Sequence, residues 1–266
     1  MASIALNDDS AAQTAIDVLL RDYSEHKEID KLISPIVQRY INKIFQGVKQ
    51  GASFEDLETY DGLLRTFCEY ILQNHPYSEH AIRAQRGIVF ADIYKGDYAA
   101  AQAGMEILIA QYPDHKDLAQ VLHWLGNDFL RMKQYTKART CYQYIADHWP
   151  QADHGLLGDA RMIRCNIRLN QDEQILTAVD AIMTKFPGHS DLSKAVFMIG
   201  EEYYNIALEQ SKEGKTQAAK ENFAKALPIW QKIVDNLPDT EYAPHAHDFV
   251  AGCYRKLVVC QDCICG

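Results

Sequence analysis

A proline recurs in this chain at a constant interval, and that interval constrains the fold more than any other feature. The prolines separated by 37 residues are Pro76, Pro113, Pro150 and Pro187. Because proline cannot continue an α-helix, each of them closes one segment of the chain. The segment 114–150 contains two helical patterns with a short polar turn between them. A fixed period of this size, with one helical hairpin per period, is typical of a helical solenoid.

The period also appears column by column when the segments are aligned on their closing prolines. The column fifteen residues before the proline is aromatic in three of four segments: Tyr98, Tyr135, Asp172 and Phe223, the last before Pro238. Three residues later the column holds Ala101, Ala138, Ile175 and Ala226. A first-helix column holds Val89, Gly126, Ile163 and Gly200, and its small residues let helix axes approach to about 8–10 Å. We therefore predict an all-α fold without strands, a right-handed superhelical solenoid of antiparallel helical hairpins.

These columns resemble the tetratricopeptide repeat, in which an aromatic residue and an alanine open the second helix and a proline ends it. The 37-residue spacing with Tyr-Pro and Phe-Pro endings is similar to the repeats of bacterial envelope proteins. The nearest class is the outer-membrane assembly lipoprotein of the β-barrel machinery, together with its relative, the Tol-Pal accessory protein. The resemblance covers about residues 53–250. The third repeat departs from the motif, because Asp172 and Ile175 replace the aromatic residue and the alanine.

Three regions follow from the repeat pattern. We expect N-terminal capping helices over residues 1–52, a solenoid over residues 53–259, and a cysteine-containing tail over residues 260–266. The solenoid units are predicted to end near the prolines already given and Pro238, and one further helix follows them. Its apolar residues would stay partly exposed without another repeat, which indicates a chain cut from a longer protein.

Two local features refine these boundaries. Ser34-Pro35 is a favourable helix start, an N-cap followed by a first-turn proline. The interval from Pro187 to Pro238 is 14 residues longer than the period. Seven residues added to each helix make about two turns apiece, so the buried faces stay in phase. We therefore predict a fourth hairpin longer than its neighbours.

Composition excludes several classes of protein. The net charge of −9 argues against nonspecific binding to nucleic acid, which requires a basic surface. No run of 18 apolar residues exists, so no membrane span is expected. The amino terminus lacks a basic region followed by an apolar stretch, and it lacks the cysteine of a lipoprotein. The sequence as it stands favours a cytoplasmic protein, or a periplasmic one if the chain is a fragment of a longer envelope protein.

The first helix of each hairpin is expected to line a concave groove. The residues predicted to lie there are Arg83, Arg86, Phe90, Tyr94, His123, Asn127, Arg131, Arg161, Arg164, Arg168 and Lys194. Guanidinium groups beside aromatic rings suit an extended peptide with carboxylates. Asn127 and Arg161 match positions of the tetratricopeptide carboxylate clamp, whereas Trp124 replaces its second asparagine. Changing Arg164 and Arg168 to glutamate is expected to abolish partner capture without unfolding the protein.

Metal binding and catalysis are less favoured. Six of the ten histidines lie close to the recurrent prolines, where polar turn residues account for them. Cys260, Cys263 and Cys265 could supply thiolates to zinc or an iron–sulfur cluster, but the chain ends before a fourth ligand. The sequence contains no glycine-rich phosphate loop, nucleophile elbow or paired His-Glu zinc motif. We expect neither a cofactor nor an enzyme.

The favoured interpretation is a noncatalytic scaffold that binds a peptide or protein segment, one with acidic residues, in its groove. Such a scaffold could act in bacterial envelope assembly. Two alternatives stay open at this point. One is a metal- or redox-responsive regulator that uses the cysteine tail, and the other is a docking module of a larger multidomain protein.

Overall fold

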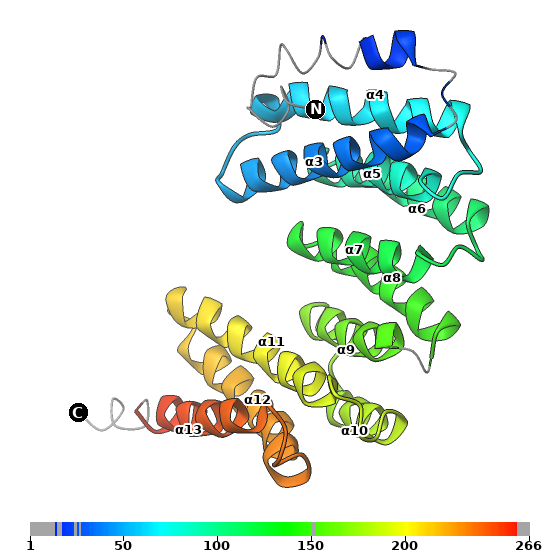
Figure 1. Ribbon diagram of the computed structural model, residues 1–266. Helices are drawn as coiled ribbons and strands as arrows, with labels where there is room; N and C mark the ends of the chain where they lie inside the picture. The colour runs from blue at the N-terminus through cyan, green and yellow to red at the C-terminus, as the bar shows by residue number, and fades with distance from the viewer. Residues whose placement is uncertain (1–13, 15–17, 24–25, 27, 151–152, 260–266) are drawn as a thin grey trace. The chain divides into compact units, whose positions relative to one another are not determined.

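The computed structural model describes residues 14, 18–23, 26, 28–150 and 153–259. Residues 1–13 of the predicted N-terminal cap and the cysteine tail 260–266 lie outside this part. The chain divides into two compact units, residues 1–121 and 122–266 (Figure 1). Within the described residues every regular element is a helix, which confirms the all-α prediction. In each unit, consecutive helices pack against one another as the predicted stacked hairpins.

The first unit contains α3, the 3-10 helix η1, α4, α5, α6 and the first turn of α7. Their bounds are Ile29–Lys49, Glu55–Leu57, Glu58–Asn74, Ala81–Lys95, Tyr98–Gln111 and Leu118–Arg131. The second unit contains the rest of α7 and α8 to α13. The bounds of these later helices are Tyr135–His148, Asp153–Arg168, Ile175–Lys185, Leu192–Lys212, Thr216–Asn236 and Ala243–Val259.

Each hairpin turns at a residue with left-handed backbone. Gly96 and Gly214 occupy this position between α5 and α6 and between α11 and α12, with φ of 85° and 76°. Lys133 and Asn170 take the same role in the two intervening hairpins, with φ of 57° and 54°. A left-handed residue at a helix C-terminus reverses the chain within a few residues. The short connections predicted by the period therefore have one common geometry.

Two glycines of the first-helix column allow the second helix of the same hairpin to pack closely against the first. A Cβ atom on Gly126 would lie 2.7 Å from the ring of Tyr142 in α8. A Cβ atom on Gly200 would lie 2.6 Å from Nε1 of Trp230 in α12. Trp230 is fully buried and donates through Nε1 to the carbonyl of Phe197 at 3.1 Å. The predicted role of small residues at the helix crossings is thus confirmed at both positions.

The start of α3 corrects one sequence-based expectation. The helix begins at Ile29, so Pro35 lies inside it and Ser34 is not its N-cap. A proline inside a helix costs about 3 kcal/mol. Ile29 and Ile33 are both fully buried, and each such burial contributes about 1.5–3 kcal/mol. The packing of these two side chains therefore outweighs the local preference of the Ser-Pro pair.

The fourth hairpin has the predicted length. Helices α11 and α12 have 21 residues each, whereas α7 and α8 have 14 each. The insertion is therefore seven residues per helix. The third hairpin differs in another way, since α10 has only 11 residues and starts at Ile175. Asp172, which replaces the aromatic residue there, accepts hydrogen bonds from Tyr203 at 2.8 Å and Lys225 at 2.7 Å. An ionic contact to the next hairpin thus takes the place of an aromatic one.

Candidate functional site

The residues predicted for the groove in the first unit lie mostly inside it. Phe90 and Tyr94 are buried, with their ring centroids 4.5 Å apart. Arg86 is also buried, and its guanidinium lies 5.7 Å from the ring centroid of Phe90. Arg83 is half exposed, and its Nη2 is 2.9 Å from Asp117 Oδ2. In this unit, therefore, Arg83 is the one predicted groove residue with substantial exposure.

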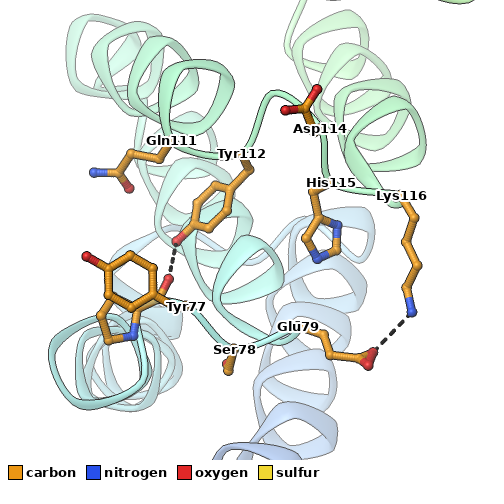
Figure 2. Close-up of a pocket in the computed structure, with 9 residues that line it drawn as sticks. Tyr77, Ser78, Glu79, Gln111, Tyr112, Asp114, His115 and Lys116 are labelled. Carbon is orange, nitrogen blue, oxygen red and sulfur yellow. Dashed lines mark hydrogen bonds and ion pairs between the residues drawn. The ribbon is translucent and has the colours of Figure 1, made fainter.

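A notch in the first unit was not predicted from the sequence. It has a volume of about 670 Å³ and lies between the loops 76–79 and 111–116 (Figure 2). Tyr112 donates to the carbonyl of Pro76 at 3.4 Å across the notch, and Tyr77 is 99% exposed beside it. Lys116 Nζ is 3.1 Å from Glu79 Oε2. Because this lysine and this glutamate neutralise each other, the exposed ring of Tyr77 and the exposed carboxylate of Asp114 are the main features that the notch offers to a ligand.

Of the histidines near the prolines, His115 and His189 are turn residues, as predicted, whereas His148 and His154 lie within the helices α8 and α9. Nδ1 of His115 accepts a hydrogen bond from the Asp117 amide at 3.1 Å. Nδ1 of His189 accepts from the Asp191 amide at the same distance. The ring of His115 meets Tyr112 edge-on, and the ring of His189 meets Phe186 edge-on. The two loops therefore share one design, in which the histidine caps the start of the following first helix.

Two arginines of α9 form a buried ion-pair network. Arg164 Nη2 is 2.7 Å from Glu202 Oε2, and Arg168 binds the other oxygen of the same carboxylate. Arg168 also lies 2.9 Å from the exposed Glu209. The pKa of Arg168 is raised, because the contacts with Glu209 and Glu202 outweigh the effect of burial. Glu202 was not among the residues predicted from the sequence, although it lies about one repeat period beyond Arg164. Pairing opposite charges across one period would have found it.

The third arginine of α9 has a different environment. Arg161 donates to Oδ1 of Asn127 on α7, and the same oxygen accepts from the Tyr142 hydroxyl at 2.9 Å. Among the described residues Arg161 contacts no carboxylate. Its Nε is buried without a hydrogen-bond partner in that part of the chain. Burial lowers the pKa of Arg161, and the nearby Arg164 and Arg131 lower it further.

His123 completes this donor cluster, which we define as His123, Asn127 and Arg161. The His123 ring is buried and meets Tyr142 edge-on at 6.3 Å between centroids. Its Nδ1 has no hydrogen-bond partner among the described residues. Burial lowers the pKa of His123 to about 4, with contributions from Arg161 and His154. The cluster therefore combines one unpaired cation with buried polar atoms that lack partners, which is the chemistry of an anion site.

The remaining predicted groove residues of the second unit are less distinctive. Arg131 Nη1 is 2.8 Å from the buried carboxylate of Asp128. Lys194 is exposed. Across the described residues, no group of three or more histidine, cysteine or acidic side chains is placed to hold a metal ion. Four cysteines of this part are buried free thiols, and burial raises the pKa of Cys165 and Cys253 to about 12.

The crystal structure of BtubC (BKLC) from P. vanneervenii matches with a TM-score of 0.39 and 13% identity, over 85% of this chain and 88% of that one. The comparison with curated proteins gives no match. In the part that the structure describes, no helix is both long and apolar enough to cross a membrane. A family model described as outer membrane lipoprotein, YfiO, matches residues 125–257, which is half of the 266 residues. The repeat resemblance is thereby confirmed, and the chain belongs to the YfiO family of outer membrane lipoproteins.

Proposed function

We propose that this protein is a noncatalytic interaction scaffold, and that its second unit holds an acidic peptide segment through the donor cluster of His123, Asn127 and Arg161. The observation that carries the proposal is the contrast within α9. Arg164 and Arg168 share Glu202, whereas Arg161 has no carboxylate among the described residues. A carboxylate from a partner would supply the missing charge.

The energetics support recognition at this position. The desolvation of the Arg161 guanidinium takes place during folding, so a partner does not bear that cost again on binding. The α7–α8 hairpin and α9 fix Asn127 and Tyr142 around the guanidinium, and a preformed site loses little ordering entropy when it binds. A charge-assisted hydrogen bond contributes about 1.5–3 kcal/mol. One carboxylate at Arg161 would therefore account for about 10- to 100-fold in affinity.

The proposal extends to the place of action. Its description as outer membrane lipoprotein supports a role for this scaffold in the bacterial envelope. Fractionation of cells that express the full gene tests this part of the proposal. Recovery of the protein with the cytoplasmic fraction would contradict it.

The binding part is tested with Arg161→Gln and a matched control, Arg139→Gln. Arg139 lies in the same unit, but its guanidinium donates to the amide oxygens of Asn166 and Gln171. A peptide library with free carboxyl termini is selected against the wild-type protein, and the affinities of the selected peptides are measured by fluorescence anisotropy. We expect acidic peptides that lose about 10- to 100-fold in affinity for Arg161→Gln and keep their affinity for Arg139→Gln. Equal affinity for both variants would refute the donor cluster as the site.

A further inference from the structure

A second surface of the same unit carries a separate inference. The long α11–α12 hairpin and α13 enclose a groove of about 570 Å³; Figure 1 shows these three helices in yellow, orange and red. Its apolar lining includes Tyr204, Ala219 and Phe223, and the rings of Tyr204 and Phe223 pack edge-on with centroids 5.2 Å apart. This groove contains none of the residues of the donor cluster.

The described lining of the groove carries charge of one sign. Its charged residues are Lys220, Arg255 and Lys256, and no acidic side chain from the described part of the chain lines it. The positive charge of this lining is opposite in sign to the net charge of the chain, which is −9. Arg255 and Lys256 are exposed, and neither forms an ion pair within the described residues. The groove therefore complements an acidic ligand with an apolar face.

Gly252 gives a second, independent indication. It lies inside α13, where glycine costs about 1 kcal/mol relative to alanine. Close packing explains three other helical glycines, which carry a similar loss of helix stability. A Cβ atom would lie within 2.7 Å of a neighbouring side chain at each of them: Gly87, Gly126 and Gly200. A Cβ atom on Gly252 would meet nothing within 4 Å among the described residues. The missing side chain thus leaves open space along the wall of the groove.

We propose that this groove docks an acidic amphipathic α-helix of a partner protein, with its apolar stripe on the partly exposed Tyr204 and its carboxylates toward Arg255 and Lys256. The lining residues on α11 and α12 span 204–211 and 216–223, and each span is about 10 Å or two helical turns. A helix satisfies its own backbone hydrogen bonds over an apolar floor, which an extended segment does not. Glycine at a crossing lets two helix axes approach to about 8 Å.

The probe is a synthetic peptide of about four helical turns with a leucine seam, glutamate on both flanks and blocked ends. A second peptide carries lysine in place of glutamate. Binding to the full chain is measured by fluorescence anisotropy, and circular dichroism confirms that each variant is folded. Gly252→Leu fills the groove wall. Its matched control is Gly62→Leu, which changes an exposed helical glycine of the first unit that also has nothing within 4 Å.

We expect the glutamate peptide to bind the wild-type protein, and Gly252→Leu to weaken this binding by at least about tenfold. Gly62→Leu and Arg161→Gln should leave it unchanged, and this result separates the groove from the donor cluster. The double variant R255E/K256E should bind the lysine peptide in place of the glutamate peptide. The proposal is overturned if the glutamate peptide does not bind, if both peptides bind the wild type equally, or if Gly252→Leu binds like the wild type. It is also overturned if phosphatidylglycerol vesicles, and not the peptide, bind through Arg255 and Lys256.

Discussion

Replacing Glu202 with glutamine isolates the buried ion-pair network of the second unit. The Glu202 side chain is 7% exposed, and those of Arg164 and Arg168 are 17% and 18% exposed. In the variant a neutral amide would face two largely desolvated guanidinium groups. Removing one partner of a buried ion pair costs about 3–5 kcal/mol, because the remaining charge is left uncompensated. Arg168 keeps its contact with the exposed Glu209, so we expect a loss near the lower end, about 3 kcal/mol.

A loss of this size is readily measured. It corresponds to a fall in melting temperature of about 10 °C for a unit of this length. All three tryptophans, Trp124, Trp149 and Trp230, belong to the second unit. Urea unfolding followed by tryptophan fluorescence therefore reports on this unit, while circular dichroism follows both.

A triple variant separates the buried-charge argument from a general loss of packing. Changing Glu202 to leucine together with Arg164 and Arg168 to methionine removes all three charges and keeps much of the apolar volume. Such replacements are often neutral or stabilising, so the triple variant should be more stable than Glu202→Gln. The reasoning is refuted if Glu202→Gln changes the free energy of unfolding by less than about 1 kcal/mol, or if the triple variant is the less stable of the two.

Two other positions of the second unit allow further stability tests. Gly200→Ala should destabilise the second unit by about 1–3 kcal/mol in urea unfolding, because the added Cβ atom would lie 2.6 Å from Trp230 Nε1. Gly62→Ala should instead stabilise the first unit by about 1 kcal/mol, because its Cβ atom meets nothing within 4 Å in the described part of the chain and alanine favours a helix over glycine. Equal effects of the two changes would contradict the packing argument. The folded-state pKa of His123, about 4, lies below its ordinary value of 6.5, so the unfolded chain binds more protons between these values and stability should fall as pH decreases through them. The loss in the free energy of unfolding should approach about 3 kcal/mol near pH 4. His123→Leu should reduce the pH dependence of the free energy of unfolding by that amount. An unchanged pH dependence in this variant would show that the pKa of His123 is not lowered by folding.

The repeat period predicted most of the fold because it follows from the packing of one hairpin on the next. The proline interval fixed the number of residues per hairpin, and the 14 additional residues before Pro238 predicted the two long helices α11 and α12. Local signals were less reliable. Ser34-Pro35 has the composition of a helix start, yet the burial of Ile29 and Ile33 extends α3 past it. Tertiary packing of this kind cannot be predicted from a short segment of sequence.

For the predicted groove residues, too, the repeat period identified the helix but not the packing of each side chain. Assigning a side chain to a first helix did not settle whether it faces solvent. Phe90 and Tyr94 have the spacing of groove residues, but both are buried between neighbouring helices. The proposed replacement of Arg164 and Arg168 by glutamate would put three carboxylates together, since both arginines contact Glu202. That double variant is therefore expected to destabilise the unit and is unsuitable as a test of binding.

In the proposed function, recognition depends on which residues adjacent repeats place opposite one another. Arg161, Arg164 and Arg168 occupy successive turns of one helix and are indistinguishable by residue type. Toward Arg164 and Arg168 the following repeat presents Glu202, so these arginines stabilise the stack. Toward Arg161 the preceding repeat presents the uncharged Asn127 and Tyr142, so its charge stays without a carboxylate in the described residues. The same change, arginine to glutamine, should therefore reduce stability at Arg164 and reduce partner binding at Arg161.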